Sequence, residues 1–392
     1  MSISLKSVFK GAFIYSFVKL LIKASAFFLI PVYTRYLTPF DYGVMGYLDV
    51  IFRLISTLLM FGFYGAQTRL YYDYNQDKDK IGELLFTLNL FLFSVLLIFC
   101  TATTLFGQSV YAAIGSRHIP FLPYFPVKTW TLLFQVLNQM AIVYYMAKRD
   151  YKTCALIQIL QFLAVTIFVI IFVVGLKQEV LGRFKGVLLG QCLCFLICYP
   201  FYIKEFKFRF SRKILKVSML FGLPVVVHLL TGVIFESIDR IILEKFVSIE
   251  SIGIYTLGYQ IGMIISILMI SFNRAWSPNF YGMMNDEKNR SDNDVRRVFY
   301  IFIMLLGAVC IIGSLFTKEF LQILVTPHYY DAGNIIPLIM ASYYIQAFYY
   351  FGVQPLFYFK KTKLLPLLTG TGALVNVGFN FLLIPDFGIY GA

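Results

Sequence analysis

The sequence has too little charge for a soluble protein of its size. Only 14% of its 392 residues are charged, whereas 59% are apolar and 18% aromatic. A soluble chain of this length needs a far more polar surface. The mean hydropathy of +0.76 indicates instead that lipid is the solvent, with each membrane span taking about 20 apolar residues. The composition therefore predicts an all-α polytopic membrane protein.

The sequence also lacks the groups that metal, redox or nucleotide chemistry needs. All six cysteines fall inside apolar runs, where they act as small hydrophobic residues. Cys192, Cys194 and Cys198 fit neither a C-x-x-C redox pair nor the usual zinc spacings. No glycine-rich loop carries a phosphate-binding pattern. We therefore expect no metal, no cofactor and no enzymatic activity.

Long apolar runs, bounded by charged or Gly/Pro-rich clusters, divide the chain into eleven predicted spans. The connectors are short, which leaves no room for an extramembrane catalytic domain. Lysines interrupt the first run and no cleavage site follows it, so we expect a retained span rather than a signal peptide. The spans cover residues 11–34, 43–69, 84–106, 120–146, 153–175, 186–203, 217–243, 253–281, 297–316, 335–358 and 364–385.

Basic residues predict the orientation of these spans. With a cytoplasmic N-terminus, 21 of the 34 lysines and arginines lie in cytoplasmic loops and seven in the opposite loops. This bias follows the positive-inside rule. The net charge of +14 is spread over several loops instead of one basic face, so nucleic acid is not an expected partner. Anionic lipid headgroups are expected partners of the basic cluster at residues 204–216.

The same cluster divides the chain into two similar halves. Residues 36–45 resemble residues 246–255, at an offset of 210: in both, a span ends, a hydroxyl residue precedes an acid, and a glycine opens the next span. We therefore predict a six-helix N-terminal lobe at 1–207, a cytoplasmic inter-lobe linker at 204–216, and a C-terminal lobe of five spans at 217–392.

Four stretches extend this pattern to a known family. They read IPVYTRYLTPFDYGVMGYLDV from residue 30, FESIDRIILEKFVSIESIGIYTLGYQI from 235, FNRAWSPNFY from 272 and NFLLIPDFGIYGA from 380. They resemble the Wzx-type flippases, the polysaccharide transporter branch of the multidrug/oligosaccharidyl-lipid/polysaccharide exporter superfamily. Members typically have twelve or more spans, and GIYGA is similar to the entrance of the twelfth, so we expect that span to be missing from this sequence.

The resemblance implies a fold and a function. The fold is two pseudo-repeated six-helix lobes around a central cavity that is often cationic. The function is alternating-access transfer of an undecaprenyl-diphosphate-linked oligosaccharide from the cytoplasmic to the outer leaflet of the bacterial inner membrane. The product would feed O-antigen, capsule or exopolysaccharide synthesis, with polysaccharide polymerase machinery as a candidate partner.

Charged residues within spans are candidate site residues, because each costs at least about 2.5 kcal/mol to insert. Lys19 and Lys23 share one face of the first span, and Lys128 and Arg274 lie in the fourth and eighth. We interpret them as a cationic, substrate-binding set for a polyanion. The alternative is that Lys19, Lys23 and Arg274 only extend to the lipid headgroups.

The second span carries Arg53 near its middle and Asp49 one turn away. One interpretation is an internal pair at i, i+4 that neutralises itself. The other is that Arg53 binds substrate phosphate while Asp49 orients its guanidinium.

The seventh span carries His228, Glu236, Asp239 and Arg240. The spacing predicts a Glu236–Arg240 pair, which would leave Asp239 as an acid able to take up a proton. His228 is either a core histidine or a proton-linked one. These residues are the candidates for ion coupling.

Prolines and glycines within the spans suggest motion and close packing. Pro224 and Pro278 lie inside predicted spans, where a proline frees backbone carbonyls, and are candidate hinges. Gly182, Gly186 and Gly190 recur at every fourth residue, which favours a close approach of helices.

Two other functions compete with a flippase. A cation-coupled multidrug exporter of the same superfamily would need an apolar or acidic cavity, whereas lysines and arginines dominate the deep positions here. A membrane glycosyltransferase or polysaccharide polymerase usually needs a sizeable outer loop, and the outer loops here are short.

Overall fold

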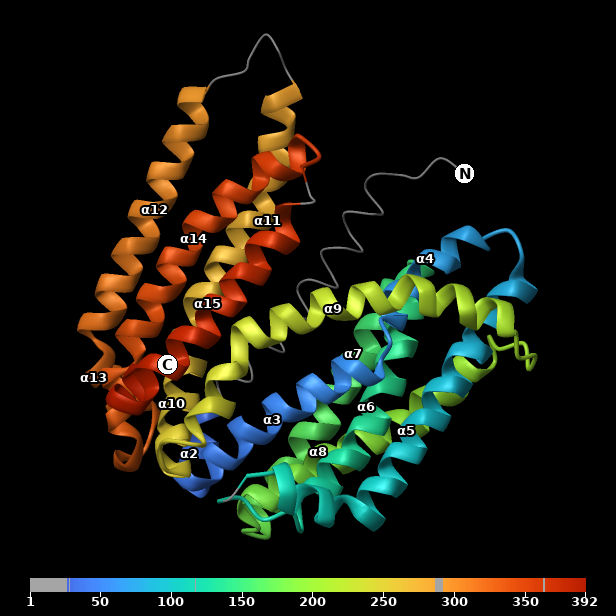
Figure 1. Ribbon diagram of the computed structural model, residues 1–392, viewed down its shortest axis with the longest axis horizontal. Coiled ribbons are helices and arrows are strands. Elements are labelled where there is room, and N and C mark those ends of the chain that lie inside the picture. Colours follow the sequence, from blue (N-terminus) through green and yellow to red (C-terminus); the bar gives the residue numbers. More distant parts are fainter. Residues whose placement is uncertain (1–26, 28, 117, 286–291, 362–363) are drawn as a thin grey trace. The chain divides into compact units, whose positions relative to one another are not determined.

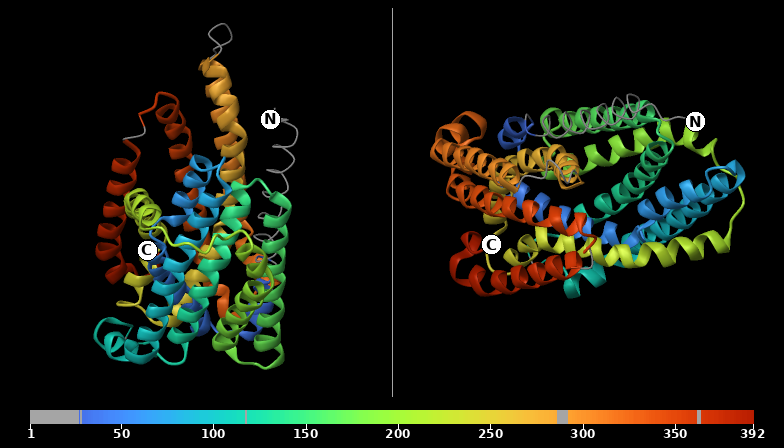
Figure 2. Two further views of the ribbon diagram at one scale, coloured as in Figure 1. Left: turned by 90° about the vertical axis from the view of Figure 1, so that its right-hand side faces the viewer. Right: turned by 90° about the horizontal axis from the view of Figure 1, so that it is seen from above.

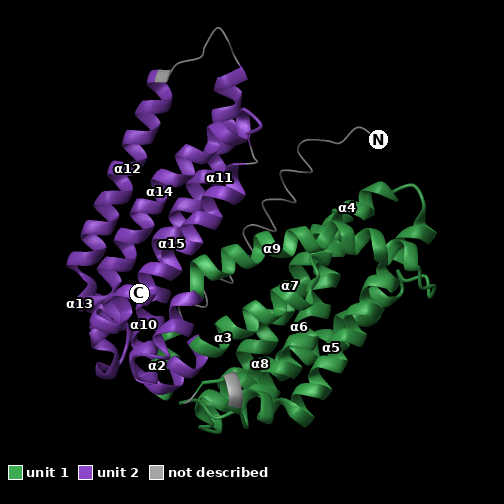
Figure 3. Cartoon of the chain, in the orientation of Figure 1, with its two compact units in different colours: residues 1–37, 47–237 green, residues 38–46, 238–392 purple. Residues whose placement is uncertain are grey.

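The structure, a computed structural model, describes residues 27, 29–116, 118–285, 292–361 and 364–392 (Figure 1). Within these residues every regular element is helical, which confirms the all-α class. The chain forms two compact units (Figure 3): unit 1 is residues 1–37 and 47–237, and unit 2 is residues 38–46 and 238–392. The predicted lobe boundaries at 207 and 217 are not tested by this division, which falls inside one long helix, and they stay predictions.

Unit 1 is built from long helices, among which α8 packs against both α7 and α6. α7 packs on α8, α8 on α6, and α6 on α5, while the short α4 packs on both α5 and α6. The π-helical turn η1 extends α7. The elements are α2 Ile30–Tyr36, α3 Pro39–Leu59, α4 Phe63–Asp73, α5 Lys78–Ile114, α6 Tyr124–Ala147, α7 Tyr151–Ile170, η1 Ile171–Gly175, α8 Glu179–Ile203 and α9 Arg212–Leu243. Unit 1 holds α3 from Tyr47 and α9 up to Ser237.

Unit 2 is centred on α14. α10, α11 and α12 all pack against α14, and α12 lies beside it along its length (Figures 1 and 2). The elements are α10 Ile249–Gly262, α11 Ile264–Asn285, α12 Asp292–Leu315, α13 Thr317–Leu324, η2 Pro327–Asn334, α14 Ile336–Tyr358, α15 Leu364–Phe387 and η3 Gly388–Tyr390.

Eight described segments are long and apolar enough to cross a membrane. Each coincides with a predicted span. The helices α6 and α14 coincide with two further predicted spans, 120–146 and 335–358. They are less apolar than the eight segments because they contain tyrosine and glutamine. The first predicted span, 11–34, lies mostly outside the described residues. The eight segments are Pro39–Asp73, Lys78–Ala112, Tyr151–Gly175, Glu179–Ile203, Arg212–Leu243, Ile249–Asn285, Asn293–Leu315 and Leu364–Tyr390.

The core of unit 1 combines an apolar face with a buried polar network. Leucines that recur every three or four residues along α5, from Leu84 to Leu96, are fully buried and belong to one cluster with the facing side of α6. Beside them, Asn89 donates to Tyr202 Oη at 3.0 Å and accepts from Tyr199 Oη at 3.0 Å. In lipid such groups are stabilised by pairing with each other, so the network fixes how α5 and α8 meet.

The two copies of the predicted repeat meet within unit 2. A Cβ atom added to Gly43 would collide with the backbone oxygen of Ile249, and one added to Gly253 would collide with that of Pro39. Residues 39 and 249, like residues 43 and 253, are 210 positions apart, so the two contacts are equivalent under the repeat. The first turns of α3 and α10 therefore cross in backbone contact, which requires glycine at both positions.

Both copies begin with a capped helix, which explains why their acids are out of register. In the first, Thr38 N donates to Asp41 Oδ2 at 2.8 Å and Asp41 N donates to Thr38 Oγ1 at 3.3 Å, a capping box. In the second, Ser251 N donates to Ser248 Oγ at 3.3 Å. The residue that completes the box is an acid in one copy and a serine in the other.

The predicted linker is held against unit 1 by its own charges. An alanine Cβ at Gly82, near the start of α5, would lie 2.7 Å from the backbone nitrogen of Lys207, so residues 204–211 run in close contact with α5. We call residues 204–211 the strap. Its ion pairs are Lys148–Glu205 at 2.6 Å, Lys207–Asp79 at 3.4 Å and Arg209–Glu83 at 3.2 Å.

Candidate functional site

Three helices of unit 1 bring one acid and two cations together. Asp49 on α3 lies between Lys128 on α6, with Nζ 2.5 Å from Oδ1, and Arg183 on α8, with Nη2 3.6 Å from Oδ2. We call these three residues the Asp49 cluster. The side chains of Lys128 and Arg183 are 14% and 21% exposed, whereas that of Asp49 is 45% exposed. The acid is therefore the accessible member and the cations are the covered ones.

Aromatic rings hold the Lys128 ammonium in place. Its Nζ lies 5.5 Å from the ring centroid of Phe52 and 5.2 Å from that of Phe184. A cation over an aromatic face is stabilised by the ring quadrupole, more strongly where water is scarce. Lys128 is therefore positioned by its surroundings as well as by the Asp49 carboxylate.

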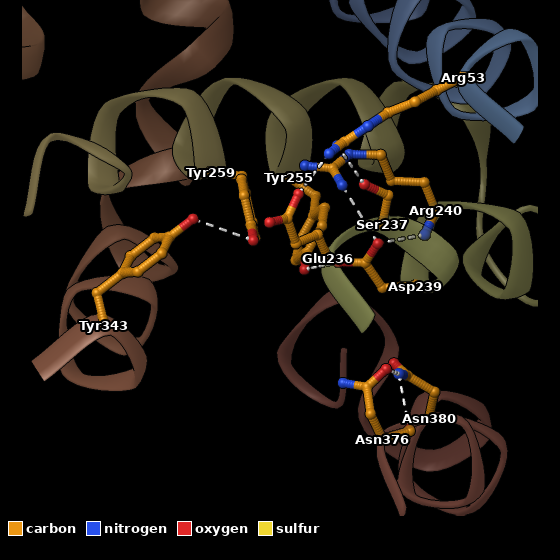
Figure 4. Close-up of polar contacts among 10 residues, drawn as sticks. All are labelled: Arg53, Glu236, Ser237, Asp239, Arg240, Tyr255, Tyr259, Tyr343, Asn376 and Asn380. Atoms are coloured by element: carbon orange, nitrogen blue, oxygen red, sulfur yellow. Dashed lines mark hydrogen bonds and ion pairs between the residues drawn. The ribbon is translucent and has the colours of Figure 1, made fainter. Parts of the chain in front are cut away.

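Arg53 forms a second cluster in unit 1, one turn further along α3. Its Nη2 lies 2.5 Å from Glu236 Oε2, and its Nη1 donates to Ser237 Oγ at 3.3 Å (Figure 4). We call Arg53, Glu236 and Ser237 the Arg53 cluster. Both charged side chains are about half exposed. Charged residues inside membrane helices almost always face the protein interior or water, so this exposed surface is expected to be wet.

Unit 2 contains a third cluster, which is sealed. Asp239 and Arg240, adjacent on α9, pair at 3.2 Å with side chains only 10% and 9% exposed. The Tyr255 hydroxyl donates to the other Asp239 oxygen, and the Arg240 guanidinium lies 4.4 Å from the ring centroid of Tyr259. Tyr343 on α14 donates to the Tyr259 hydroxyl at 3.1 Å (Figure 4). We call these five residues the Asp239 cluster.

The partners of the predicted acids differ from those expected at i, i+4. Asp49 binds Lys128 and Arg183, while Arg53 is bound by Glu236 and Ser237. The local-pair interpretation of Asp49 and Arg53 omitted these tertiary partners, because spacing along one helix carries no information about cations on neighbouring helices.

The predicted pairing on α9 also needs correction. Glu236 pairs with Arg53, and Arg240 pairs with Asp239 and lies over Tyr259. Asp239 is therefore not left over as an acid without partners. The reason is geometric: the adjacent backbone nitrogen of Arg240 donates to Asp239 Oδ1 at 2.8 Å, which holds the carboxylate beside its neighbour.

The other predicted site residues take different positions. Lys19 and Lys23 lie outside the described residues. His228 and Arg274 are exposed on α9 and α11. Trp276, two residues after Arg274, is buried and stacks with Phe272 at 6.4 Å between ring centroids. Their roles in binding or coupling stay predictions.

The two predicted hinge prolines, Pro224 and Pro278, lie inside α9 and α11, and both helices continue past them. Both are exposed. Whether either bends the chain during a functional cycle stays a prediction.

Sequence reasoning missed Arg183, which it assigned to an outer loop. α8 begins at Glu179, seven residues before the predicted span, and so includes Arg183. The signal was present: Gly182, Gly186 and Gly190 already mark a helical face. In the structure a Cβ atom on Gly186 would lie 2.6 Å from the Val169 backbone, so this face packs closely on α7, as predicted.

None of these clusters resembles a metal centre. Within the described ranges, no group of three or more His, Cys, Asp or Glu side chains is placed to hold an ion. The arrangement in unit 1 suits a different chemistry. Its two clusters set three cations against two acids, which leaves one positive charge in excess: Lys128, Arg183 and Arg53 face Asp49 and Glu236.

Comparison with known proteins agrees with the fold and the resemblance. Residues 8–284 match the family described as polysaccharide biosynthesis protein. Lsg locus putative protein 1 of Haemophilus influenzae is 22% identical over 406 residues, covering 98% of this chain and 95% of the relative. The inward-facing conformation of a multidrug resistance MATE family transporter of the MOP superfamily aligns with a TM-score of 0.76 at 16% identity, over 95% of this chain and 92% of that one. MATE in the straight conformation aligns with a TM-score of 0.62 at 14% identity, over 98% and 90%.

These similarities show the family and the fold of this chain. The helical fold is the one that these MATE transporters share. The eight candidate spans indicate a multi-pass membrane protein. Since the family match spans well over half of its length, this chain belongs to the polysaccharide biosynthesis protein family.

Proposed function

We propose that this protein is a flippase for an undecaprenyl-diphosphate-linked oligosaccharide. It would carry the repeat unit from the cytoplasmic to the outer leaflet by alternating access, for O-antigen, capsule or exopolysaccharide synthesis. The membership of the polysaccharide biosynthesis family supports the glycan, and the MOP fold supports movement across a bilayer. The proposal also includes a bacterial inner membrane, a cytoplasmic N-terminus, and polymerase machinery as the recipient of the product.

The observation that carries the proposal is the excess of positive charge in unit 1. The Asp49 and Arg53 clusters hold three cations against two acids. All of them except Lys128, which lies on α6, are on segments long and apolar enough to cross a membrane. An uncompensated charge at such a position is costly unless a ligand or water relieves it. A diphosphate is the part of the proposed substrate that would relieve it, while the polyprenyl tail stays in lipid.

Flipping in vesicles tests this directly. Purified protein is reconstituted with a fluorescent lipid-linked oligosaccharide, and the fraction reaching the opposite leaflet is measured for the parent and for Arg53→Gln and Lys128→Gln. Both substitutions are expected to slow flipping at least about tenfold, as expected where a charge-assisted contact to phosphate is lost. Glu83→Gln, in the strap contact, is the matched control. Normal flipping by both variants, with normal insertion, would refute the cationic mechanism.

A deletion strain separates a flippase from a polymerase. The flippase proposal expects single lipid-linked repeat units trapped on the cytoplasmic leaflet. Units that have already reached the outer leaflet, but remain unpolymerised, would contradict it.

A multidrug exporter of the same superfamily is the second candidate. The likeness to MATE transporters favours it, as does the accessibility of the acids Asp49 and Glu236, which organic cations would seek. Substrate charge distinguishes the two: an exporter should transport cationic dyes, and Asp49→Asn should abolish that transport. The excess of cations in unit 1 favours the flippase.

Ion coupling forms a further part of the proposal. Of the three acid–base candidates, Glu236 and the exposed His228 lie on the unit 1 part of α9, whereas Asp239 is covered by Arg240 and Tyr255. Protonation of Glu236 would release Arg53, which gives a proton a direct route to the proposed site. Loss of pH-gradient stimulation in Glu236→Gln but not in Asp239→Asn would support that order.

A further inference from the structure

We propose that Asp49 is a built-in substitute for the phosphate of a ligand: it holds Lys128 and Arg183 in place, and a phosphate or diphosphate group displaces it from them. The ligand's identity as a lipid-linked diphosphate rests on the proposed function, but the displacement itself does not.

The Asp49 cluster exposes its acid and covers its cations. The two cations are mostly covered, and the carboxylate they bind is nearly half exposed. A ligand approaching this surface meets Asp49, the most exposed member, and the Asp49 carboxylate occupies the position at which the two cations are bound. The same position therefore serves the internal acid and an incoming anion.

The charges of the Asp49 cluster do not balance. One carboxylate faces two cations, so the cluster is one positive charge in excess. A phosphate monoester or diphosphate carries more charge and more acceptor oxygens than a carboxylate, and it suits the fork of a guanidinium. Replacing Asp49 by such a group would neutralise the cluster fully, which the acid alone does not.

A displaced Asp49 carboxylate has another cation nearby, Arg53. Arg53 follows Asp49 by one turn on the same face of α3. In the Arg53 cluster, as far as the structure describes it, one acid faces one cation. This difference places anion exchange at the Asp49 cluster, while Arg53 can receive Asp49 once it is released.

The test is anion binding by purified protein, measured without transport. Unfolding temperature is followed during titration with inorganic pyrophosphate at constant ionic strength, for the parent, Asp49→Asn, Arg183→Gln and Glu205→Gln. Removing the competing acid is expected to tighten pyrophosphate binding about tenfold or more, whereas Arg183→Gln should weaken it by a similar factor. Glu205→Gln removes an acid from another ion pair of unit 1 and should leave the affinity unchanged.

Several outcomes decide the proposal. Binding to Asp49→Asn that is equal to or weaker than binding to the parent overturns it. If Asp49→Asn does not stay folded alone, recovery by pyrophosphate but not by sodium chloride supports it, and absence of recovery overturns it. The double variant Asp49→Asn/Lys128→Gln should lose the gain, because the cation released by the first change is gone.

Further arms identify the source of the phosphate. Farnesyl diphosphate represents a prenyl-linked diphosphate, and nanodiscs with or without phosphatidylglycerol represent a lipid headgroup. Competition by farnesyl diphosphate at lower concentration than pyrophosphate indicates a lipid-linked ligand, whereas loss of pyrophosphate binding in phosphatidylglycerol nanodiscs indicates a headgroup. If the protein binds pyrophosphate in exchange for Asp49 but flips no lipid-linked oligosaccharide in vesicles, the displacement proposal is supported and the flippase proposal is refuted.

Discussion

The Asp49 and Asp239 clusters use the same side-chain chemistry in opposite ways. In each, an aspartate on a membrane-spanning helix faces a basic group. In unit 2 the pair is neutral, sealed and surrounded by tyrosines. In unit 1 two cations share one acid, and that acid is accessible. The comparison teaches that charge excess and access, rather than the presence of charge, distinguish a candidate binding site from a structural pair.

The physical reason lies in what each cluster gains from a ligand. A buried, fully paired acid and base have nothing to gain from an added ion, and breaking the pair leaves an isolated charge in a poorly polarisable medium. An over-cationic cluster with an exposed acid gains from an anion and loses little if the acid moves. We therefore expect substitutions in the Asp239 cluster to act on stability and those in the Asp49 cluster to act on binding.

The largest effect is expected from breaking the sealed pair. Arg240→Met leaves Asp239 buried without its cation and should lower the free energy of unfolding by about 3–5 kcal/mol. Size-exclusion chromatography of the solubilised protein and its melting temperature provide the measurement. The control is Asp239→Leu/Arg240→Met, which removes both charges and should recover most of the loss. If Arg240→Met is as stable as the parent, the Asp239 cluster is as accessible to water as the Asp49 cluster.

A smaller effect on stability is expected at the half-exposed pair. Arg53→Gln should change the free energy of unfolding by at most about 1 kcal/mol, because an accessible ion pair contributes little, although flipping should fall sharply. Comparing melting temperature with flipping rate in the same preparation checks both. A loss of stability as large as that of Arg240→Met would show that Arg53 faces lipid rather than water, and would erase the contrast.

Much of the fold followed from the sequence, and the reasons are local. Hydropathy located the spans because each must satisfy its own backbone hydrogen bonds in lipid. The offset of 210 located a real contact because Gly43 and Gly253 have to be glycine where α3 and α10 cross. The positions of the spans depend on one segment at a time. The contact between α3 and α10 depends on a repeat that occurs twice in the sequence.

The site was predictable only as a set of candidates. Deep charge singled out Asp49, Lys128 and Glu236, but the pairing could not be read from spacing, because the bonds Lys128–Asp49 and Arg53–Glu236 join residues 79 and 183 positions apart. Arg183 was missed because its helix begins earlier than hydropathy suggests. Local rules such as i, i+4 pairing compete with tertiary contacts, and here the tertiary contacts prevail.

The smallest effect is expected at a third ion pair, Lys148–Glu205, which is in the strap outside the membrane-spanning segments. Burial raises the pKa of Glu205, but hydrogen bonds from Lys148 and Tyr144 outweigh it and hold that pKa below the usual glutamate value of 4.5. A lowered pKa stabilises the folded state above the normal glutamate range, and this contribution disappears as the pH falls through the folded-state value. Since both side chains are more than a third exposed, the contribution should not exceed about 1 kcal/mol.

Melting curves of the parent and Glu205→Gln between neutral and strongly acidic pH test this expectation. The parent should be slightly more stable at neutral pH, and the two curves should converge below the normal glutamate range, where Glu205 is protonated. Lysine stays charged throughout, so Lys148 adds no slope of its own. A difference in melting temperature that persists unchanged into strong acid would mean that Glu205 acts by packing and not by its charge. The Lys148–Glu205 pair could then not be compared, as an ion pair in water, with the charged pairs within the membrane.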